Sequence, residues 1–415
     1  MSCSNSPWIE LVSYDDILSA SDTLRGQVHD TSCARSWTLS NVVGCDPWLK
    51  FENLQFTASF KERGAINRLS QLVKDDAVTG VVAMSAGNHA QGVAYHAQRL
   101  GVAATIVMPV GTPTVKIVNT ERYGATVIVK GKTLEDSSAF AHQYGEENKL
   151  TFIHPYDDPM VIAGQGTLGL EVLSQVPDLD VLIVPVGGGG LAAGIAIAAK
   201  QIKPDIQLIG VQAELFPSVY NFFHGHSLAT KSDSLAEGIA VKQPGLLTRQ
   251  IICDLLDDLV LVSEAALERA VSLLIDIEKT VVEGAGAAGI AAILSEPQRF
   301  AGRKVGAILC GGNIDTRLLA GVLTRNLARQ GRLSRLLIDL VDQPGHLARV
   351  TNCLGDAGAN IVEVAHQRVF SDLPAKAALL DVFVETRDVQ HLKATVAALE
   401  EAGLTVKLET SFEDE

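Results

Sequence analysis

Lys61 is the side chain with the clearest chemical potential, and it lies in the segment Ser59-Phe60-Lys61-Glu62-Arg63-Gly64. A lysine amine can form a Schiff base with a carbonyl cofactor when its surroundings favour the neutral form. The alternative is a solvated lysine at the beginning of a helix, because charged side chains are mostly exposed. Lys61 alone therefore does not identify a site, and the neighbouring motifs must decide between the two interpretations.

A second motif, Ser85-Ala86-Gly87-Asn88-His89-Ala90-Gln91-Gly92, separates an expected strand (VVAM) from an expected helix (VAYHAQRL). Small residues at such a turn leave backbone N–H groups unpaired, so the turn and the helix dipole can receive a carboxylate. The Asn88 amide is also suited to bond a cofactor oxygen. An ordinary tight turn is the alternative, and an isolated histidine such as His89 is more often structural than catalytic.

Four consecutive glycines, Gly187, Gly188, Gly189 and Gly190, precede Leu191 between the expected strand VLIVPV and the helix AAGIAIAAK. Glycines let the backbone fold around a phosphate, and the beginning of the helix offers further donors. A flexible linker is the alternative, but linkers are polar and this segment joins two apolar elements. The pattern favours a phosphate site. It is neither GxGxxG nor GxxxxGK[ST], which disfavours a dinucleotide or a nucleoside triphosphate.

The segment Cys310-Gly311-Gly312-Asn313 ends the expected strand KVGAIL. A thiol at this place can meet a ring nitrogen as a neutral, weak hydrogen-bond partner. Taken alone, a buried structural cysteine is the more common explanation. The order of the four motifs along the chain is therefore more informative than any one of them.

The composition limits the class of protein. The chain has 415 residues, a net charge of −14, a pI near 5.2 and 47% hydrophobic residues, so two or three folded units are expected. The acidic balance argues against nucleic acid or an anionic membrane as partner. Six scattered cysteines without a CxxC pair, and no signal-peptide pattern, favour the reducing cytoplasm. The uncharged run 181–199 is broken by Pro185 and the glycines, which predicts a strand, a turn and a helix rather than a membrane span.

Residues from about 51 to 320 alternate β-branched runs with helical stretches, which predicts an α/β fold with parallel sheets. The expected strands are VTGVVAMS, ATIVMP, ATVIVK, VLIVPV, IQLIGV and KVGAILC. SEAALERAVSLLIDIEK is an expected helix, with a Ser263 cap and with Leu267, Val271 and Leu274 on one face. After residue 331 the elements follow the ferredoxin-like order βαββαβ, so a boundary is expected near Arg332. The acidic tail 411–415 is expected to be frayed.

Taken together, the motifs resemble the threonine ammonia-lyases, or threonine dehydratases, of the second pyridoxal-phosphate (PLP) fold type, in their medium-length form. SFKxRGA, SxGNHxQG, GQGT (164–167), GGGGL and CGGN occur in the family's order and spacing, and the similarity begins near Val12. DQPGHL and GANI resemble an ACT domain, a small amino-acid-binding regulatory module. The resemblance implies a two-lobed, tryptophan synthase beta-like catalytic domain at 1–331, with a smaller lobe inserted at roughly 52–160, and an ACT domain at 332–415.

The resemblance also implies pyridoxal 5'-phosphate as cofactor and a role for each motif. Lys61 resembles the Schiff-base lysine, Phe60 the residue beside the pyridine ring, and Asn88 the partner of the cofactor's 3-hydroxyl. Cys310 occupies the place that faces the pyridine nitrogen. The phosphate cradle is matched by Gly187, Gly188, Gly189, Gly190 and Leu191, and the substrate-carboxylate loop by Ser85, Ala86, Gly87, Asn88 and His89.

The implied activity is deamination of L-threonine to 2-oxobutanoate and ammonia, with L-serine giving pyruvate more slowly. Once substrate replaces it on the cofactor, Lys61 is positioned to remove the α-proton, and the cofactor is the electron sink. Cys310 supplies no anion to keep the ring nitrogen protonated, so we expect a weaker sink than with an aspartate. Prompt loss of the β-hydroxyl then competes well with other fates. The resemblance assigns the acid for this leaving group to the cofactor phosphate.

The chain departs from the family pattern at several positions. Ala58 stands where the family commonly has Gly, and Thr31-Ser32-Cys33 replaces a usual Thr-Pro. Ala86 lacks the second hydroxyl with which serine racemases protonate the opposite face, so poor racemisation is expected. Glu214 resembles one ligand of the divalent cation found in some relatives, but Tyr220 falls where the other carboxylate should be. No tight divalent metal site is therefore expected.

Three alternatives stay open. One is a sibling lyase for another hydroxyamino acid such as threo-3-hydroxyaspartate, whose second carboxylate would want an additional Arg or Lys. Another is a serine racemase. The third, disfavoured by the intact motifs, is a non-catalytic amino-acid sensor. By family analogy, a branched-chain amino acid, isoleucine or valine, is expected to bind between ACT domains of a homodimer or homotetramer. The sequence does not distinguish isoleucine biosynthesis from threonine catabolism.

Overall fold

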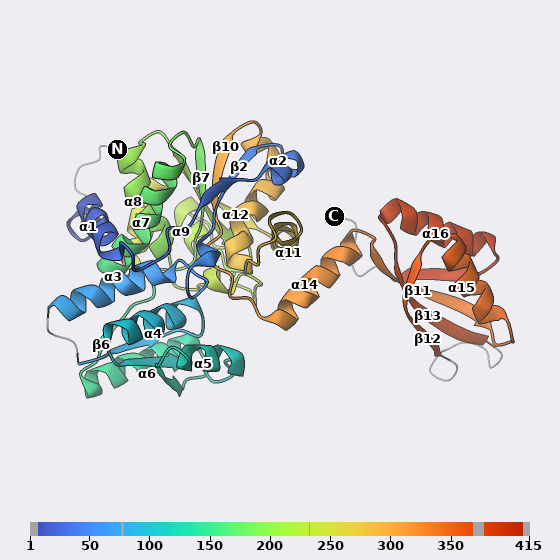
Figure 1. The fold of residues 1–415 in the computed structure, drawn as a ribbon, viewed down its shortest axis with the longest axis horizontal. Coiled ribbons are helices and arrows are strands. Elements are labelled where there is room, and N and C mark those ends of the chain that lie inside the picture. The colour runs from blue at the N-terminus through green and yellow to red at the C-terminus, as the bar shows by residue number, and fades with distance from the viewer. Residues whose placement is uncertain (1–6, 76–78, 232, 368–376, 410–415) are drawn as a thin grey trace. The chain divides into compact units, whose positions relative to one another are not determined.

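The computed structural model describes residues 7–75, 79–231, 233–367 and 377–409. The chain forms two compact units, Met1–Ile314 and Asp315–Glu415 (Figure 1). The second unit includes the helix that precedes the expected boundary at Arg332, and that boundary stays a prediction. Cys3 and the acidic tail 411–415, for which fraying is expected, lie outside the described residues.

The first unit contains a six-stranded sheet in the order β1-β2-β10-β7-β8-β9. Its strands are β1 (Cys33–Arg35), β2 (Asp46–Lys50), β7 (Val181–Pro185), β8 (Gln207–Ala213), β9 (Asp258–Val262) and β10 (Lys304–Ile308). β1 is antiparallel to β2, whereas the other neighbouring pairs are parallel. Every residue of β7 is buried. A continuous apolar run is what a central parallel strand requires, because helices cover both faces of such a sheet.

A smaller, parallel sheet of the same unit has the order β5-β4-β3-β6. Its strands are β3 (Val81–Met84), β4 (Ala104–Met108), β5 (Thr126–Val129) and β6 (Thr151–Phe152). On one face, Ala83 and Ile106 pack in a core with Leu69 and Val93 from two helices. The opposite face packs against a third helix through Ala141. The sheet is therefore covered on both sides, as its apolar strands require.

Helices surround both sheets. They are α1 (Tyr14–Leu24), α2 (Trp37–Val43), α3 (Lys61–Lys74), α4 (Asn88–Leu100), α5 (Thr114–Glu121), α6 (Leu134–Asn148), α7 (Pro159–Gln175), α8 (Gly190–Ile202), α9 (Ser218–His224), α10 (Leu246–Leu255), α11 (Glu264–Leu273), α12 (Gly284–Ser295) and α13 (Pro297–Phe300), with 3-10 turns η1 (Pro7–Glu10), η2 (Glu52–Leu54) and η3 (Glu237–Ile239). The predicted cap of α11 is confirmed, because Ser263 Oγ accepts from Ala266 N at 3.2 Å. This α-helix ends earlier than expected, since a wider π-helical turn, η4 (Leu274–Glu278), follows it.

The six strands expected from apolar runs are confirmed as β3, β4, β5, β7, β8 and β10. Strands β1, β2, β6 and β9 were not expected. β1, β2 and β6 are short or carry polar residues, whereas the apolar run 259–262 of β9 was an available signal that sequence reasoning missed. Three of the four sequence motifs follow β3, β7 and β10, of which β7 and β10 are direct neighbours, and the Lys61 motif begins α3. Carboxyl ends of parallel strands share one edge of a sheet, which is where α/β proteins place their ligands. The fold therefore gathers the motifs at strand ends.

The uncharged run 181–199 forms β7, the glycine turn and the first part of α8, as the sequence predicts. Within the residues that the structure describes, no helix is both long and apolar enough to span a bilayer.

The second unit has the predicted βαββαβ order. It contains α14 (Thr316–Arg329), β11 (Leu333–Val341), α15 (His346–Asp356), β12 (Asn360–Gln367), β13 (Ala377–Glu385), α16 (Val389–Glu401) and β14 (Thr405–Glu409). Its sheet is antiparallel, in the order β12-β13-β11-β14. Leu336 and Val382 of the sheet pack with Val350 and Leu399 of the two helices in one core. This ferredoxin-like arrangement is compatible with an ACT-like domain.

Candidate active site

Lys61 is the first residue of α3, and its amine is enclosed by protein although the residue keeps some solvent contact. Lys61 Nζ donates to the Pro155 carbonyl oxygen at 2.7 Å. Burial lowers the pKa of the amine to about 8, although the nearby Cys310 and Glu283 act in the opposite direction. The interpretation of Lys61 as an ordinary solvated lysine is therefore wrong. The neutral, nucleophilic fraction of this amine near neutral pH is therefore larger than that of an ordinary lysine.

The loop before Lys61 is fixed by backbone pairing with the cysteine turn. Phe60 N donates to the Cys310 carbonyl at 3.1 Å, and Gly312 N donates to the Ala58 carbonyl at 2.9 Å. Ala58 has a φ of 55°, which is the left-handed region that favours glycine. The family's usual glycine at this position thus has a physical reason, and this chain tolerates backbone strain there. The pairing brings two separate motifs, around Lys61 and Cys310, into one site.

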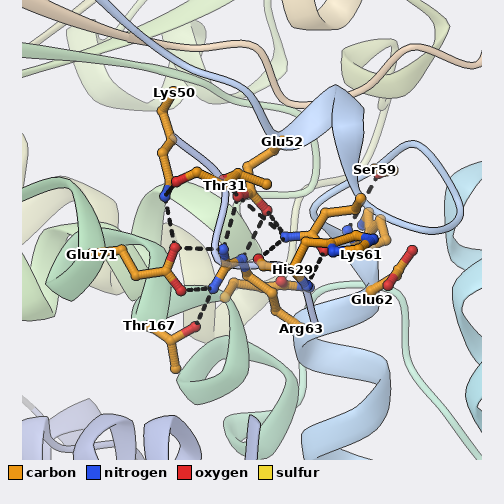
Figure 2. A network of polar contacts seen from close by, with 12 residues as sticks. His29, Thr31, Lys50, Glu52, Ser59, Lys61, Glu62, Arg63, Thr167 and Glu171 are labelled. Atoms are coloured by element: carbon orange, nitrogen blue, oxygen red, sulfur yellow. Dashed lines mark hydrogen bonds and ion pairs between the residues drawn. The ribbon is translucent and has the colours of Figure 1, made fainter. Parts of the chain in front are cut away.

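An anchoring network of Lys50, Glu52, Arg63 and Glu171 holds the first turn of α3 through the Arg63 guanidinium (Figure 2). Arg63 Nε and Nη2 donate to the two Glu52 carboxylate oxygens, both at 2.8 Å. Arg63 also donates to both oxygens of Glu171, at 2.6 and 2.8 Å. This double bidentate arrangement uses the planar guanidinium fully.

The anchoring network balances its charges. Lys50 Nζ donates to Glu171 Oε2 at 2.7 Å and to the Thr31 carbonyl at 2.5 Å, and Thr31 Oγ1 donates to Glu52 at 2.6 Å (Figure 2). The side chains of Lys50, Glu52 and Arg63 are fully buried. Burying charges is tolerated only when each has good partners. The network ties β2, α3 and α7 together, and sequence reasoning missed it.

The loop after β3 presents unpaired backbone donors. The first helical hydrogen bond of α4 is Gln91 N to the Gly87 carbonyl, so the N–H groups of Asn88, His89 and Ala90 have no partner within the helix. Ser85 Oγ accepts from Gly87 N at 3.1 Å, which shapes the turn. These donors and the helix dipole suit a carboxylate, as the sequence suggests.

His89 is buried and neutral near neutral pH. Its Nε2 bonds the Ile153 carbonyl at 3.0 Å, which assigns the proton to Nε2. Its Nδ1 has no hydrogen-bond partner among the described residues. Burial and the positive charge of Lys61 lower the pKa of this imidazole to about 3. His89 Nδ1 is thus an orphaned acceptor close to the Lys61 amine.

Glu283, just before α12, is a site residue that sequence reasoning missed. Asn88 Nδ2 donates to Glu283 Oε1 at 2.7 Å, and Asn313 Nδ2 donates to Asn88 Oδ1 at 2.8 Å. Burial is the largest effect on the Glu283 carboxyl and raises its pKa to about 7. Asn88 Nδ2 keeps a second N–H for another oxygen. A single acidic residue directly before an otherwise apolar helix, GAGAAGIAAIL, was the available sequence signal.

The glycine segment after β7 is packed too closely to admit side chains. A Cβ on Gly188 would lie 2.2 Å from the Tyr156 ring, and Gly189 has a φ of +98°. Thr248 Oγ1 donates to the Gly188 carbonyl at 2.7 Å. The first bond of α8 is Ala193 N to the Gly189 carbonyl, so the preceding N–H groups have no helical partner. The flexible-linker interpretation is therefore wrong.

The four motifs meet in one place. Tyr156, against Gly188, directly follows Pro155, which binds the Lys61 amine. Gly311 of the cysteine turn is close to both Asn88 and Glu283, because a Cβ there would lie 3.0 Å from Asn88 Nδ2 and 2.4 Å from Glu283 Oε1. Phe60 is buried beside the Lys61 amine, with 5.3 Å between the ring centroid and Nζ.

These residues fit PLP. A poised amine, a glycine cradle with unpaired N–H donors, and a free Asn88 N–H match its aldehyde, its phosphate and its 3-hydroxyl. Burial raises the pKa of the Cys310 thiol well above its usual range, so the thiol is neutral. A neutral thiol suits an unprotonated ring nitrogen.

The expected absence of a divalent site stays a prediction. Glu214 is exposed, and the Tyr220 ring lies against His224, with 4.5 Å between ring centroids. In the described ranges, no three His, Cys, Asp or Glu side chains are grouped to hold a metal ion.

The comparisons with known proteins agree with this geometry. Residues 24–311 match the family described as pyridoxal-phosphate dependent enzyme. L-threonine ammonia-lyase of Thermotoga maritima is 40% identical over 400 residues, covering 96% of this chain and 100% of the relative. The processed form of threonine deaminase isoform 2 from Solanum lycopersicum has a TM-score of 0.70 at 35% identity, covering 77% of this chain and 88% of that one.

A pyridoxal 5'-phosphate-dependent aspartate racemase has a TM-score of 0.70 at 34% identity, covering 74% of this chain and 98% of that one. The chain belongs to the family of pyridoxal-phosphate-dependent enzymes that includes L-threonine ammonia-lyase.

Proposed function

We propose that this chain deaminates L-threonine to 2-oxobutanoate and ammonia with PLP as cofactor, and L-serine to pyruvate more slowly. The observation that carries the proposal is the enclosed Lys61 amine, which bonds the Pro155 carbonyl at 2.7 Å next to the glycine segment and whose pKa is lowered to about 8 by burial. Such an amine can bind a carbonyl carbon and later act as a base near neutral pH.

Each motif has a proposed task in holding the cofactor and the substrate. Lys61 would bind PLP covalently, Phe60 would flank its ring, and Cys310 would face the ring nitrogen. The 3-hydroxyl would receive the second Asn88 N–H. The phosphate would lie on the N–H groups of Gly187, Gly188, Gly189, Gly190 and Leu191. The substrate carboxylate would lie on Ser85, Ala86, Gly87, Asn88 and His89.

PLP, when bound, supplies the electron sink for the α-carbanion. Lys61 removes the α-proton, and the Pro155 carbonyl orients its Nζ through the 2.7 Å hydrogen bond. Cys310 is neutral, so it would place no negative charge beside the ring nitrogen, and the electron sink that the cofactor supplies would be weaker than with a carboxylate partner. Ala86 offers no hydroxyl to return a proton from the opposite face, so racemisation should be slow.

The test is release of 2-oxo acid from L-threonine, L-serine and threo-3-hydroxyaspartate by the purified holoenzyme. The proposal expects threonine to have the highest kcat/KM of the three. Borohydride reduction of the holoenzyme should fix the cofactor at Lys61, identifiable by peptide mass. Equal or greater turnover of hydroxyaspartate would contradict the threonine assignment, and a colourless protein that forms no adduct would favour the non-catalytic sensor.

For the second unit we propose regulation by an amino acid. Its ferredoxin-like core supports an ACT-like module. We expect isoleucine or valine as the effector, bound between the modules of two paired copies. The paired copies would belong to a homodimer or a homotetramer. A chain ending before Arg332 should keep the chemistry and lose the response. Unchanged inhibition in that truncated enzyme would refute the proposal. The unpaired Cys33, Cys45, Cys253, Cys310 and Cys353 support a cytoplasmic location.

A further inference from the structure

An ion pair between Lys116 and Glu237 joins the two lobes of the first unit. Lys116 lies on α5, which follows β4 of the smaller sheet, and Glu237 begins η3, which follows β8 of the larger sheet. Lys116 Nζ lies 2.5 Å from Glu237 Oε2. The Lys116 side chain is 21% exposed and that of Glu237 is 64% exposed. The pair therefore lies at a partly solvated rim.

This rim belongs to the candidate active site. Gly238, directly after Glu237, packs between the glycine segment and Glu283, because a Cβ on Gly187 would lie 2.8 Å from the Gly238 carbonyl oxygen, and one on Gly238 would lie 3.3 Å from Glu283 Oε1. On the opposite side, the strand before α5 pairs in parallel with β3, which leads into the carboxylate loop.

A substrate with two carboxylates needs a cation for its second carboxylate, and Lys116 is the candidate at this rim. Burial lowers the pKa of the His89 and His154 imidazoles, so both are neutral near neutral pH. In the described part of the chain, the cations that act on the Glu283 carboxyl are Lys116 and Lys61. Lys61 is assigned to the cofactor in the proposed function, so Lys116 is the cation next to Glu283 that we consider for a second carboxylate.

We propose that Glu237 is a specificity-determining residue that makes the site reject hydroxyamino acids with a second carboxylate. This inference rests on the proposed deamination of hydroxyamino acids. Glu237 is ion-paired with Lys116, so a β-carboxylate that approaches this rim must compete with Glu237 for Lys116 and is repelled by the negative charge of Glu237. An anion removed from water without a partner binds poorly. The methyl group of threonine and the hydrogen of serine carry no such cost.

The experiment measures kcat/KM for threo-3-hydroxyaspartate relative to L-threonine in the full-length holoenzyme, by release of 2-oxo acid. Glu237→Gln frees Lys116 and should raise this ratio about fivefold, a modest change because solvent screens a rim charge. Lys116→Met removes the cation and leaves Glu237 unpaired, so the ratio should fall by a similar factor. Glu121→Gln, an exposed residue of the same helix, changes the net charge equally and should leave the ratio unchanged.

Opposite shifts in the two variants support the inference, and the Lys116→Met result decides it alone if Glu237→Gln does not fold. A ratio unchanged within about twofold in the folded variants, or moved in one direction by both, overturns it. In those cases wild-type threonine turnover persists, so the proposed function stands. If the wild type turned over neither substrate, the proposed function and the inference would fail together.

Discussion

Lys61 and Arg63 are separated by one residue of α3, yet the protein treats their charges in opposite ways. Arg63 is fully buried and paired with Glu52 and Glu171, and these partners raise its pKa. Lys61 has no carboxylate within salt-bridge distance in the described residues, and burial lowers its pKa to about 8. The paired Arg63 anchors the beginning of α3, whereas the pKa of the Lys61 amine is the one shifted towards neutral pH.

The comparison extends to their neighbours. The anchoring network has two cations and two anions, each with short hydrogen bonds. Around Lys61, the groups that titrate are all shifted towards neutrality, since burial raises the pKa of Glu283 to about 7 and lowers that of His89 to about 3. Paired charges give rigidity, whereas unpaired and enclosed groups give proton-transfer chemistry near neutral pH.

The largest expected effect is the loss of chemistry at Lys61. Lys61→Ala should lower kcat for threonine by about 10⁴-fold, because the proposed covalent attachment and the proposed base would disappear together. The visible absorbance of the bound cofactor should also change. Thermal unfolding should show an intact fold, since the anchoring network is untouched. If the variant retained more than about a tenth of the wild-type turnover, Lys61 would not be the reactive residue that distinguishes it from Arg63.

Removing the guanidinium of the anchoring network should cost stability. Arg63→Met leaves Glu52 and Glu171 without their main partner, so the free energy of unfolding should fall by about 3–5 kcal/mol. Urea unfolding measures it. Arg68→Met is the matched control, because the Arg68–Asp158 pair at 3.2 Å keeps solvent contact and should contribute under about 1 kcal/mol. Equal losses in both variants would contradict the special role of the network.

Glu283→Gln should change how stability depends on pH. The Glu283 pKa is raised from 4.5 to about 7 in the folded protein, so its stabilising contribution is full below 4.5 and is lost as pH rises towards 7. The glutamine cannot ionise, so the cofactor-free variant should gain about 2 kcal/mol relative to wild type between pH 5 and pH 8. Urea unfolding at both values measures this. Glu147→Gln, at an exposed position of α6, is the charge-matched control. A pH-independent difference for Glu283→Gln would count against the shifted carboxyl.

The smallest expected effect concerns the strained residue before Lys61. Ala58→Gly relieves a φ of 55° but gives the unfolded chain more freedom, so the net gain in unfolding free energy should be about 0.5–1 kcal/mol. Lys149→Gly, at a φ of 56° on an exposed helix end, is the matched control and should gain a similar amount. A loss of stability in Ala58→Gly would show that its methyl group contributes packing that exceeds the strain.

The sequence alone predicts most elements of both units. Apolar runs of β-branched residues fix β3, β4, β7, β8 and β10, because such runs fit strands buried on both faces. The motifs around Lys61, Asn88, Gly187–Gly190 and Cys310 are also visible, since three of them place reactive or small residues at a strand end and the fourth places a lysine at the beginning of a helix. What the sequence cannot say is which charges are enclosed, and Lys50 in a strand looks like any exposed lysine.

Only the tertiary structure determines which charged side chains pair and how their pKa values shift. Arg63 meets Glu171, and Asn88 meets Glu283, across 108 and 195 residues of chain. Such contacts depend on how β2, α3, α7 and α12 pack, and no local pattern specifies that packing. Burial then sets each pKa according to the partners present. Short sequence motifs therefore indicate the type of chemistry, whereas only the assembled fold sets the pKa values of the Lys61 amine and the Glu283 carboxyl.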